Sequence, residues 1–161
     1  MAVEIKRKDK DALKKVYERL GALGKREVAV GYPAGKASAY PDGTAVAQVA
    51  AWNVFGTPRI PKRDFFALAK DDIKKEALEI MKLVAVAKTE EKQEVLMNLA
   101  GEAATSALKQ AITDLDSPPN APGTLHPSIG GTNSRGKKSS NPLIDTGHMR
   151  NSTTYVVRDK T

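Results

Sequence analysis

The sharpest feature of this sequence is a change of composition after residue 116. Of the 25 residues from 117 to 141, 16 are Pro, Gly, Ser or Asn. Such a segment buries too little apolar surface to offset the entropy cost of ordering it. The sequence therefore predicts a flexible Pro/Gly/Ser-rich loop or arm over 117–141, which we expect neighbouring chains to order in an assembly.

The chain regains a regular pattern after this arm. Residues 152–157 alternate in the way that is typical of a strand, and residues 27–32 show the same alternation. A strand that follows a flexible arm is stable only where it pairs with an existing sheet edge, so we expect these two segments to pair. Asp145, Thr146 and Gly147 are expected to form a tight turn before the strand, with Asp145 or Thr146 capping a short helix.

Apolar residues recur at helical spacing in four stretches, which are residues 9–23, 44–56, 64–88 and 89–115. Thr44, Asp64 and Thr89 are expected to open the last three helices, because their side-chain oxygens accept the free amide hydrogens of a first turn. Together with a small β-sheet, this set of about four helices predicts an α+β fold. The length suits a single domain over 1–161 with the arm attached.

Residues 57–66 contain two prolines, which lack a backbone N–H and disfavour a helix. We expect an extended strap here that side-chain burial holds against the body. A subunit interface is the alternative use for this aromatic-rich stretch. The side chains expected to hold the strap are Trp52, Phe55, Ile60, Phe65 and Phe66.

Signals of enzyme chemistry are poor in this sequence. The absence of cysteine excludes a disulfide scaffold, thiolate zinc sites and cysteine nucleophiles. His126 and His148 lack the further ligands that a zinc site needs. Asp145, His148 and Ser152 lie near one another in sequence, which does not define a catalytic triad. We therefore expect no enzyme activity and no catalytic, cofactor-binding or metal site.

The balance of 26 Lys and Arg against 19 Asp and Glu gives a net charge of +7. This charge suits nucleic acid, an acidic protein surface or an anionic membrane as a partner. Arg135, Lys137 and Lys138 in the arm are candidate nucleic-acid contacts, although three charges give only a weak, salt-sensitive attraction. No apolar run approaches the ~18 residues of a membrane span, and no secretory signal is expected.

Three segments, in the same order, resemble motifs of the neck or tail-completion proteins of long-tailed bacteriophages. They are VAAWNVFGTPRIPKRDFF (49–66), DSPPNAP (116–122) and NPLIDTGHMRNSTTYVV (141–157). Val54 departs from the family pattern, where glutamate is usual, and Asp64 departs where proline is usual. The matching residues of the first and third motifs are Asn53, Phe55, Gly56, Thr57, Ile60, Pro61, Arg63, Phe65, Pro142, Leu143, Asp145, Thr146, Gly147, Met149, Asn151, Ser152 and Tyr155.

The resemblance implies a structural protein of the virion at the head–tail junction, which completes or caps the tail as part of a ring. It implies a hexamer to match a sixfold tail, assembly in the bacterial cytoplasm, and motif residues at interfaces. The implied partners are copies of itself and adjacent neck, tail-terminator, tail-tube or connector proteins, with DNA nearby and no membrane. The alternative is a basic module that contacts nucleic acid through its arm, which salt-sensitive DNA binding by the monomer would favour.

Overall fold

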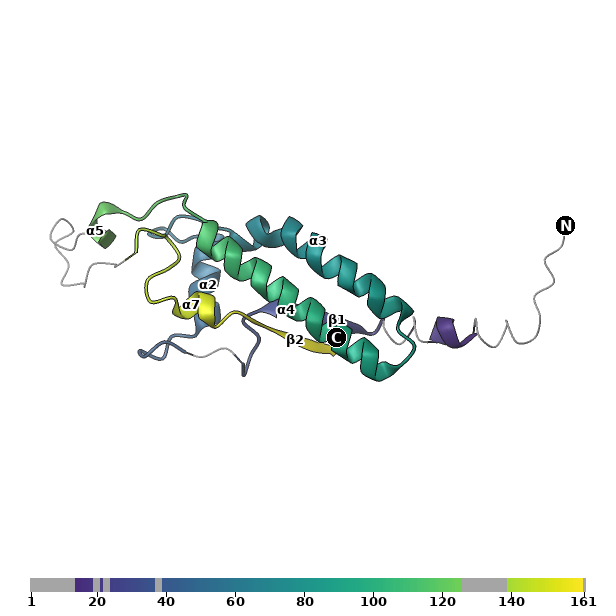
Figure 1. The fold of residues 1–161 in the computed structure, drawn as a ribbon. Helices are drawn as coiled ribbons and strands as arrows, with labels where there is room; N and C mark the ends of the chain where they lie inside the picture. Colours follow the sequence, from purple (N-terminus) through teal and green to yellow (C-terminus); the bar gives the residue numbers. More distant parts are fainter. Residues whose placement is uncertain (1–13, 19–20, 22–23, 37–38, 126–138, 161) are drawn as a thin grey trace.

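A computed structural model of this chain describes residues 14–18, 21, 24–36, 39–125 and 139–160 (Figure 1). Its strands and helices form a small α+β fold with a two-stranded sheet, as the sequence predicts. Their order is β1 (Arg26–Gly31), α2 (Val46–Phe55), α3 (Phe65–Val86), α4 (Glu90–Asp114), α5 (Pro122–Leu125), α7 (His148–Asn151) and β2 (Thr154–Asp159).

The longest elements are α3 and α4, which lie side by side as an antiparallel pair (Figure 1). Each helix begins at its predicted cap. The Asp64 carboxylate accepts a hydrogen bond from the Ala67 N–H at 3.0 Å, and the Thr89 hydroxyl oxygen accepts one from the Lys92 N–H at 3.3 Å. Both caps satisfy amide hydrogens that the first turn of a helix leaves without a partner.

Two local expectations before α3 are wrong. Helix α2 does not open at Thr44, whose N–H instead closes a turn by donating to the Asp42 carboxylate at 2.9 Å. The segment after α2 is not extended throughout, because Thr57 and Ile60 exchange two backbone hydrogen bonds of 2.8 and 3.2 Å in a tight turn. Pro58 stands second in this turn, where its fixed φ favours turning over extension.

The predicted pairing of the early and the last strand is confirmed. β1 and β2 run antiparallel, with Val30 opposite Tyr155, although β2 begins at Thr154 rather than at residue 152. Just beyond the strand ends, the Thr153 hydroxyl donates a hydrogen bond to the Tyr32 hydroxyl oxygen at 3.2 Å. Burial raises the pKa of Tyr32 to about 12, so this hydroxyl stays uncharged and joins the two strand ends.

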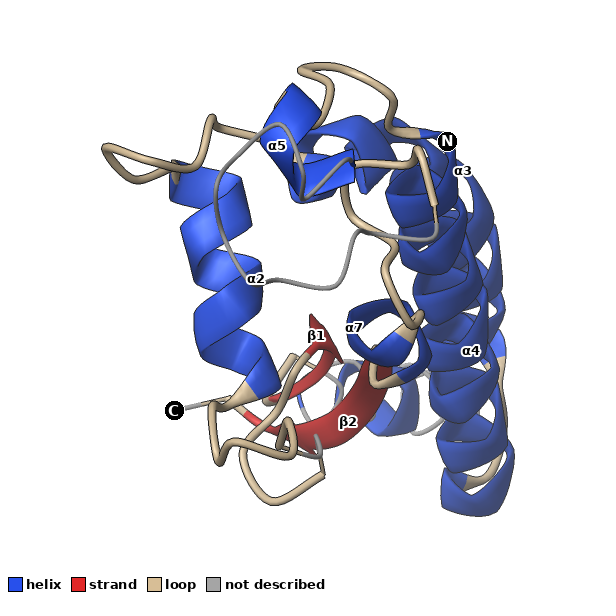
Figure 2. Cartoon of the chain, turned by 90° about the vertical axis from the view of Figure 1, so that its left-hand side faces the viewer, coloured by secondary structure: helices blue, strands red, loops and turns tan. Residues whose placement is uncertain are grey.

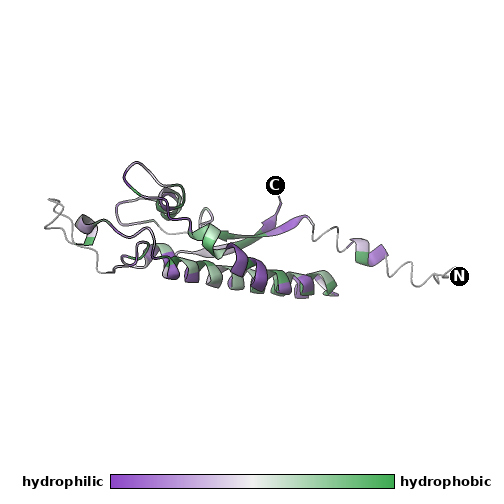
Figure 3. Cartoon of the chain, turned by 90° about the horizontal axis from the view of Figure 1, so that it is seen from above, coloured by the Kyte–Doolittle hydropathy of each residue, from purple (hydrophilic) through white to green (hydrophobic). Residues whose placement is uncertain are grey.

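The sheet packs on α4 through one close contact. Gly101 in α4 has no Cβ, and the ring of Tyr155 from β2 occupies the place where a Cβ would stand. The Tyr155 hydroxyl also donates a hydrogen bond to the Asn98 side-chain oxygen at 3.2 Å, one turn earlier on the same helix. Figure 3 shows the strands as a second layer over the helix pair. Packing on α4 stabilises this sheet, because a sheet of two strands alone is only marginally stable.

The main core lies at the end of α4 that is remote from the α3–α4 connection. It joins one face of α2, the first turns of α3, the last turns of α4 and the segment before β2. Figure 2 shows α2 set apart from α3 and α4, with α7 and the strands between them. The buried residues of this cluster are Val46, Ala50, Val54, Phe65, Ala69, Leu108, Ala111, Ile112, Leu115, Leu143 and Met149.

The predicted first helix and the arm are described only in part. Residues 14–18 are helical and exposed, whereas 9–13, 19–20 and 22–23 of that helix lie outside the described residues. In the arm, residues 126–138 lie outside them, and with them His126, Arg135, Lys137 and Lys138. None of the helices within the described residues is both long enough and apolar enough to cross a membrane.

Replacing Gly101 with alanine is expected to destabilise the fold, although alanine favours a helix over glycine by about 1 kcal/mol. The added Cβ overlaps the Tyr155 ring, and overpacking of this kind costs about 1–3 kcal/mol. In a Tyr155→Ala background the same change is expected to stabilise the protein. Chemical denaturation of the four chains measures the coupling, and an equal effect of Gly101→Ala in both backgrounds would contradict the contact.

Candidate functional site

Arg63 joins the first motif to the second. Its side chain is buried, with 6% of the residue's surface exposed. Nε donates to the Pro118 carbonyl oxygen at 2.8 Å, and a terminal guanidinium nitrogen donates to the Pro119 carbonyl oxygen at 2.9 Å. The Arg63 N–H donates to the Asn53 carbonyl oxygen at 2.6 Å. Burial lowers the pKa of Arg63, but a guanidinium stays charged in a protein. Arg63 therefore fixes the start of the arm beside the end of α2.

The turn after α2 depends on Gly56. Its φ of 76° lies in the left-handed region that favours glycine. A Cβ there would also lie 3.1 Å from the Lys62 nitrogen and 3.3 Å from the Ile60 carbonyl oxygen. Phe65 follows the turn, is fully buried, and stacks on Phe66 with ring centroids 4.8 Å apart. These motif residues build the corner between α2 and α3.

The third motif begins where α4 ends. The Asn141 side-chain amide donates to the Thr113 carbonyl oxygen at 2.7 Å, and its side-chain oxygen accepts from the Leu143 N–H at 2.9 Å. The Asn120 side chain donates to the Ser140 carbonyl oxygen at 3.3 Å. Asn141 thus satisfies the carbonyl end of α4, and both described ends of the arm are fixed to the same corner of the fold.

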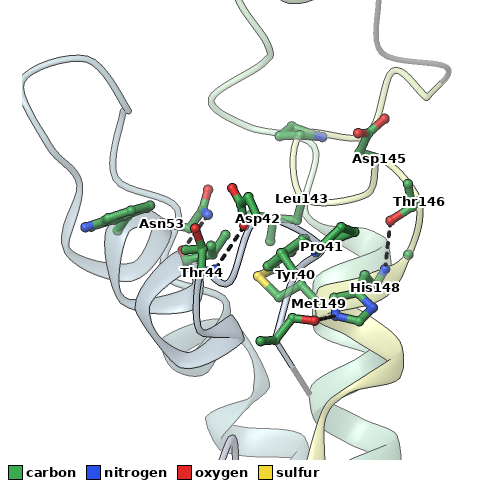
Figure 4. A pocket seen from close by; sticks show the side chains of 15 residues that line it. Tyr40, Pro41, Asp42, Thr44, Asn53, Leu143, Asp145, Thr146, His148 and Met149 are labelled. Carbon is green, nitrogen blue, oxygen red and sulfur yellow. Dashed lines mark hydrogen bonds between the residues drawn. The ribbon is translucent and has the colours of Figure 1, made fainter. Parts of the chain in front are cut away.

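The third motif also forms one wall of a groove of about 630 Å³ (Figure 4). The opposite wall is the loop before α2 together with α2 itself. The groove brings together the predicted residues Asn53, Asp145, Thr146 and Gly147, which belong to the first and third motifs. The lining residues are Ala39, Tyr40, Pro41, Asp42, Thr44, Val49, Trp52, Asn53, Pro142, Leu143, Asp145, Thr146, Gly147, His148 and Met149.

Two carboxylates line the groove. Asp42 comes from the loop before α2 and Asp145 from the third motif, and both act on Tyr40 between them. Burial raises the pKa of Tyr40, and the charges of Asp145 and Asp42 raise it further. Hydrogen bonds from Thr44 lower the pKa of Asp42, which keeps this carboxylate charged. Among the described residues that line the groove, none is Lys or Arg.

The chain bends before α7 at Gly147, whose φ is 77°. The expected cap is wrong, because Gly147 itself is the N-cap residue of α7 and neither Asp145 nor Thr146 caps the helix. The Thr146 hydroxyl oxygen accepts a hydrogen bond from the His148 N–H at 3.3 Å within this bend. The His148 ring packs edge-on against Tyr40 with centroids 4.7 Å apart, and its Nε2 lies 3.2 Å from the Ala39 carbonyl oxygen. Within the described ranges, no three His, Asp or Glu side chains are placed to hold a metal ion.

The expected burial of the aromatic residues is wrong for two of them. Phe65 is buried and Phe66 is partly buried, but Phe55 is 80% exposed and Trp52 is 39% exposed. The buried stripe of α2 consists of Val46, Ala50 and Val54. Because these positions recur every four residues, the aromatic stripe lies on the opposite side of the helix. The strap therefore depends on Phe65, not on Phe55.

Some groove residues were not predicted from the sequence, and some predicted site residues lie outside the groove. Tyr40 and Asp42 belong to the groove, yet the only sequence signal there is the turn sequence Pro-Asp-Gly at 41–43. That signal does not tell which segment the turn faces. The predicted residues outside the groove are Phe55, Gly56, Thr57, Ile60, Pro61, Arg63, Phe65, Asn151 and Ser152.

Comparison with known proteins gives no match: no family model, curated protein or solved structure is significantly similar to this chain. Its function is therefore inferred from the three motifs and from the geometry that joins them.

Replacing Arg63 with methionine keeps the side-chain stem and removes both guanidinium contacts to the arm. We expect a loss of about 1–3 kcal/mol in the free energy of unfolding, because two carbonyl oxygens lose a charged donor. Amide hydrogen exchange of residues 120–125 should also become faster. Arg59→Met, at an exposed position nearby, should change stability by less than about 0.5 kcal/mol. Unchanged stability and exchange in Arg63→Met would contradict the role given to Arg63.

Proposed function

We propose that this chain is a structural subunit of a tailed-phage virion at the head–tail junction, where it completes or caps the tail as part of a ring. The ordered set of three motifs supports this proposal. The contacts among the motifs support it further, because Arg63 joins the first motif to the second and Asn120 joins the second to the third. A joining protein needs segments held together in this way and flexible arms, and it needs no catalytic group.

The observation that carries the proposal is the exposure of Phe55. Its motif neighbours have tasks inside the fold: Gly56 allows the turn, Arg63 holds the arm and Phe65 fills the core. Phe55 is 80% exposed, and Trp52 lies one turn earlier on the same side of α2. Aromatic side chains of this kind contribute strongly to affinity once a partner covers them. We therefore assign Phe55 and Trp52 to a contact between subunits.

The proposal includes the ring and its neighbours. We take the ring to be a hexamer, since the tail it meets is sixfold. Its other partners are adjacent neck, tail-terminator, tail-tube or connector proteins, and assembly takes place in the cytoplasm of the bacterial host. A subunit contact that uses one patch on one copy and a different patch on the next closes into such a ring when the rotation from copy to copy is sixfold.

The subunit contact is tested with Phe55→Ser and a matched control. The purified chain is expected to form closed rings in native mass spectrometry. Phe55→Ser should weaken association at least tenfold without lowering the melting temperature, because the side chain is exposed in the monomer. The control is Leu78→Ser, which removes an exposed leucine of α3 outside the motifs and should leave association unchanged.

Two results would contradict this assignment. One is equal association of the wild-type and Phe55→Ser chains. The other is a monomer that binds DNA in a salt-sensitive way and loses this binding when Arg135, Lys137 and Lys138 become serine, which would favour the nucleic-acid module.

A further inference from the structure

The groove beside Tyr40 carries two acidic side chains. Asp42 and Asp145 stand on its two walls (Figure 4). In the described part of the chain, neither carboxylate forms an ion pair with a Lys or Arg side chain. Two carboxylates in one concave surface favour a cationic ligand.

The rest of the lining suits the stem of a long cationic side chain. Tyr40 and Trp52 supply aromatic rings, and Pro41, Pro142 and Leu143 supply further apolar surface. A cation near an aromatic face is attracted by the ring quadrupole, and its methylene groups gain from apolar contact. The groove therefore matches lysine or arginine better than a neutral or an acidic ligand.

The chain itself contains a segment of this chemistry. Residues 135–138 read Arg-Gly-Lys-Lys, with three positive charges and no negative charge. They belong to the 13 residues between Leu125 and Ser139 that lie outside the described residues. Since an extended chain spans at most about 3.6 Å per residue, a loop of this length reaches roughly 20 Å from its two ends.

We propose that the groove binds the basic segment Arg135–Lys138 of a neighbouring copy of this chain. The cationic side chains lie over Tyr40 and Trp52 and pair with Asp42 and Asp145. This inference rests on the proposed function, because the neighbouring copy is the next subunit of the ring. Each copy gives its segment to one neighbour and receives one from the other, and such head-to-tail contacts close into rings.

Binding is tested with the full chain carrying R135S, K137S and K138S, so that its own segment does not compete, and with a peptide of residues 128–138. Trp52 lines the groove and is the only tryptophan of the chain, so its fluorescence reports on this site. The peptide should cause a saturable change that salt weakens. Adding D42N and D145N should weaken binding about tenfold, because two ion pairs are lost.

Two matched controls accompany this titration. D71N and D72N remove the same charge from the exposed surface of α3 and should leave the affinity unchanged. A peptide with serine at its three basic positions should not bind. Equal binding of both peptides, or an affinity that D42N and D145N do not lower, overturns the inference.

Mixing two variants distinguishes a neighbouring copy from the same chain. The D42N/D145N chain keeps the basic segment, and the R135S/K137S/K138S chain keeps the groove. With isotope labelling of one variant, native mass spectrometry should show mixed complexes enriched over those of either variant alone. No enrichment overturns the inference in favour of contact within one chain. Rings that form equally well from both single variants also overturn it, while they leave the proposed function standing.

Discussion

The contact of the Tyr155 ring with the bare backbone of α4 at Gly101 is the interaction on which the rest of the fold depends. A pair of strands is marginal alone, and β2 follows a long segment rich in Pro, Gly, Ser and Asn. The tyrosine anchors β2 on the longest helix, and the β1 pairing completes the layer. Because β2 is fixed, the segment before it, which contains Asp145, is held opposite α2.

The other fixed point is the carbonyl end of α4. Asn141 satisfies that end, and Arg63 holds Pro118 and Pro119 beside it, so the arm leaves and returns at one corner. In this arrangement hydrogen-bonding groups hold the arm in position, while apolar side chains such as Phe55 stay exposed. A fold that fixes the ends of an arm and exposes an aromatic side chain beside them is suited to joining subunits.

The parts of the fold that were predictable from the sequence are those set by local physics. The helix starts at Asp64 and Thr89 follow from capping, the left-handed Gly147 follows from turn chemistry, and the strand pairing follows because a terminal strand needs an edge. The exposure of Phe55 was not predictable, because it depends on which stripe of α2 meets the core. The contact of Arg63 with the arm and the groove beside Tyr40 arise from tertiary packing, which leaves no periodic pattern.

Electron microscopy of tails from a phage that encodes this chain, assembled with and without it, tests the central claim most directly. Tails that contain the protein should carry an additional ring at the end that meets the head, and tails made without it should lack this ring and fail to join heads. Tails that are identical in both preparations, and that join heads equally well, would contradict the account.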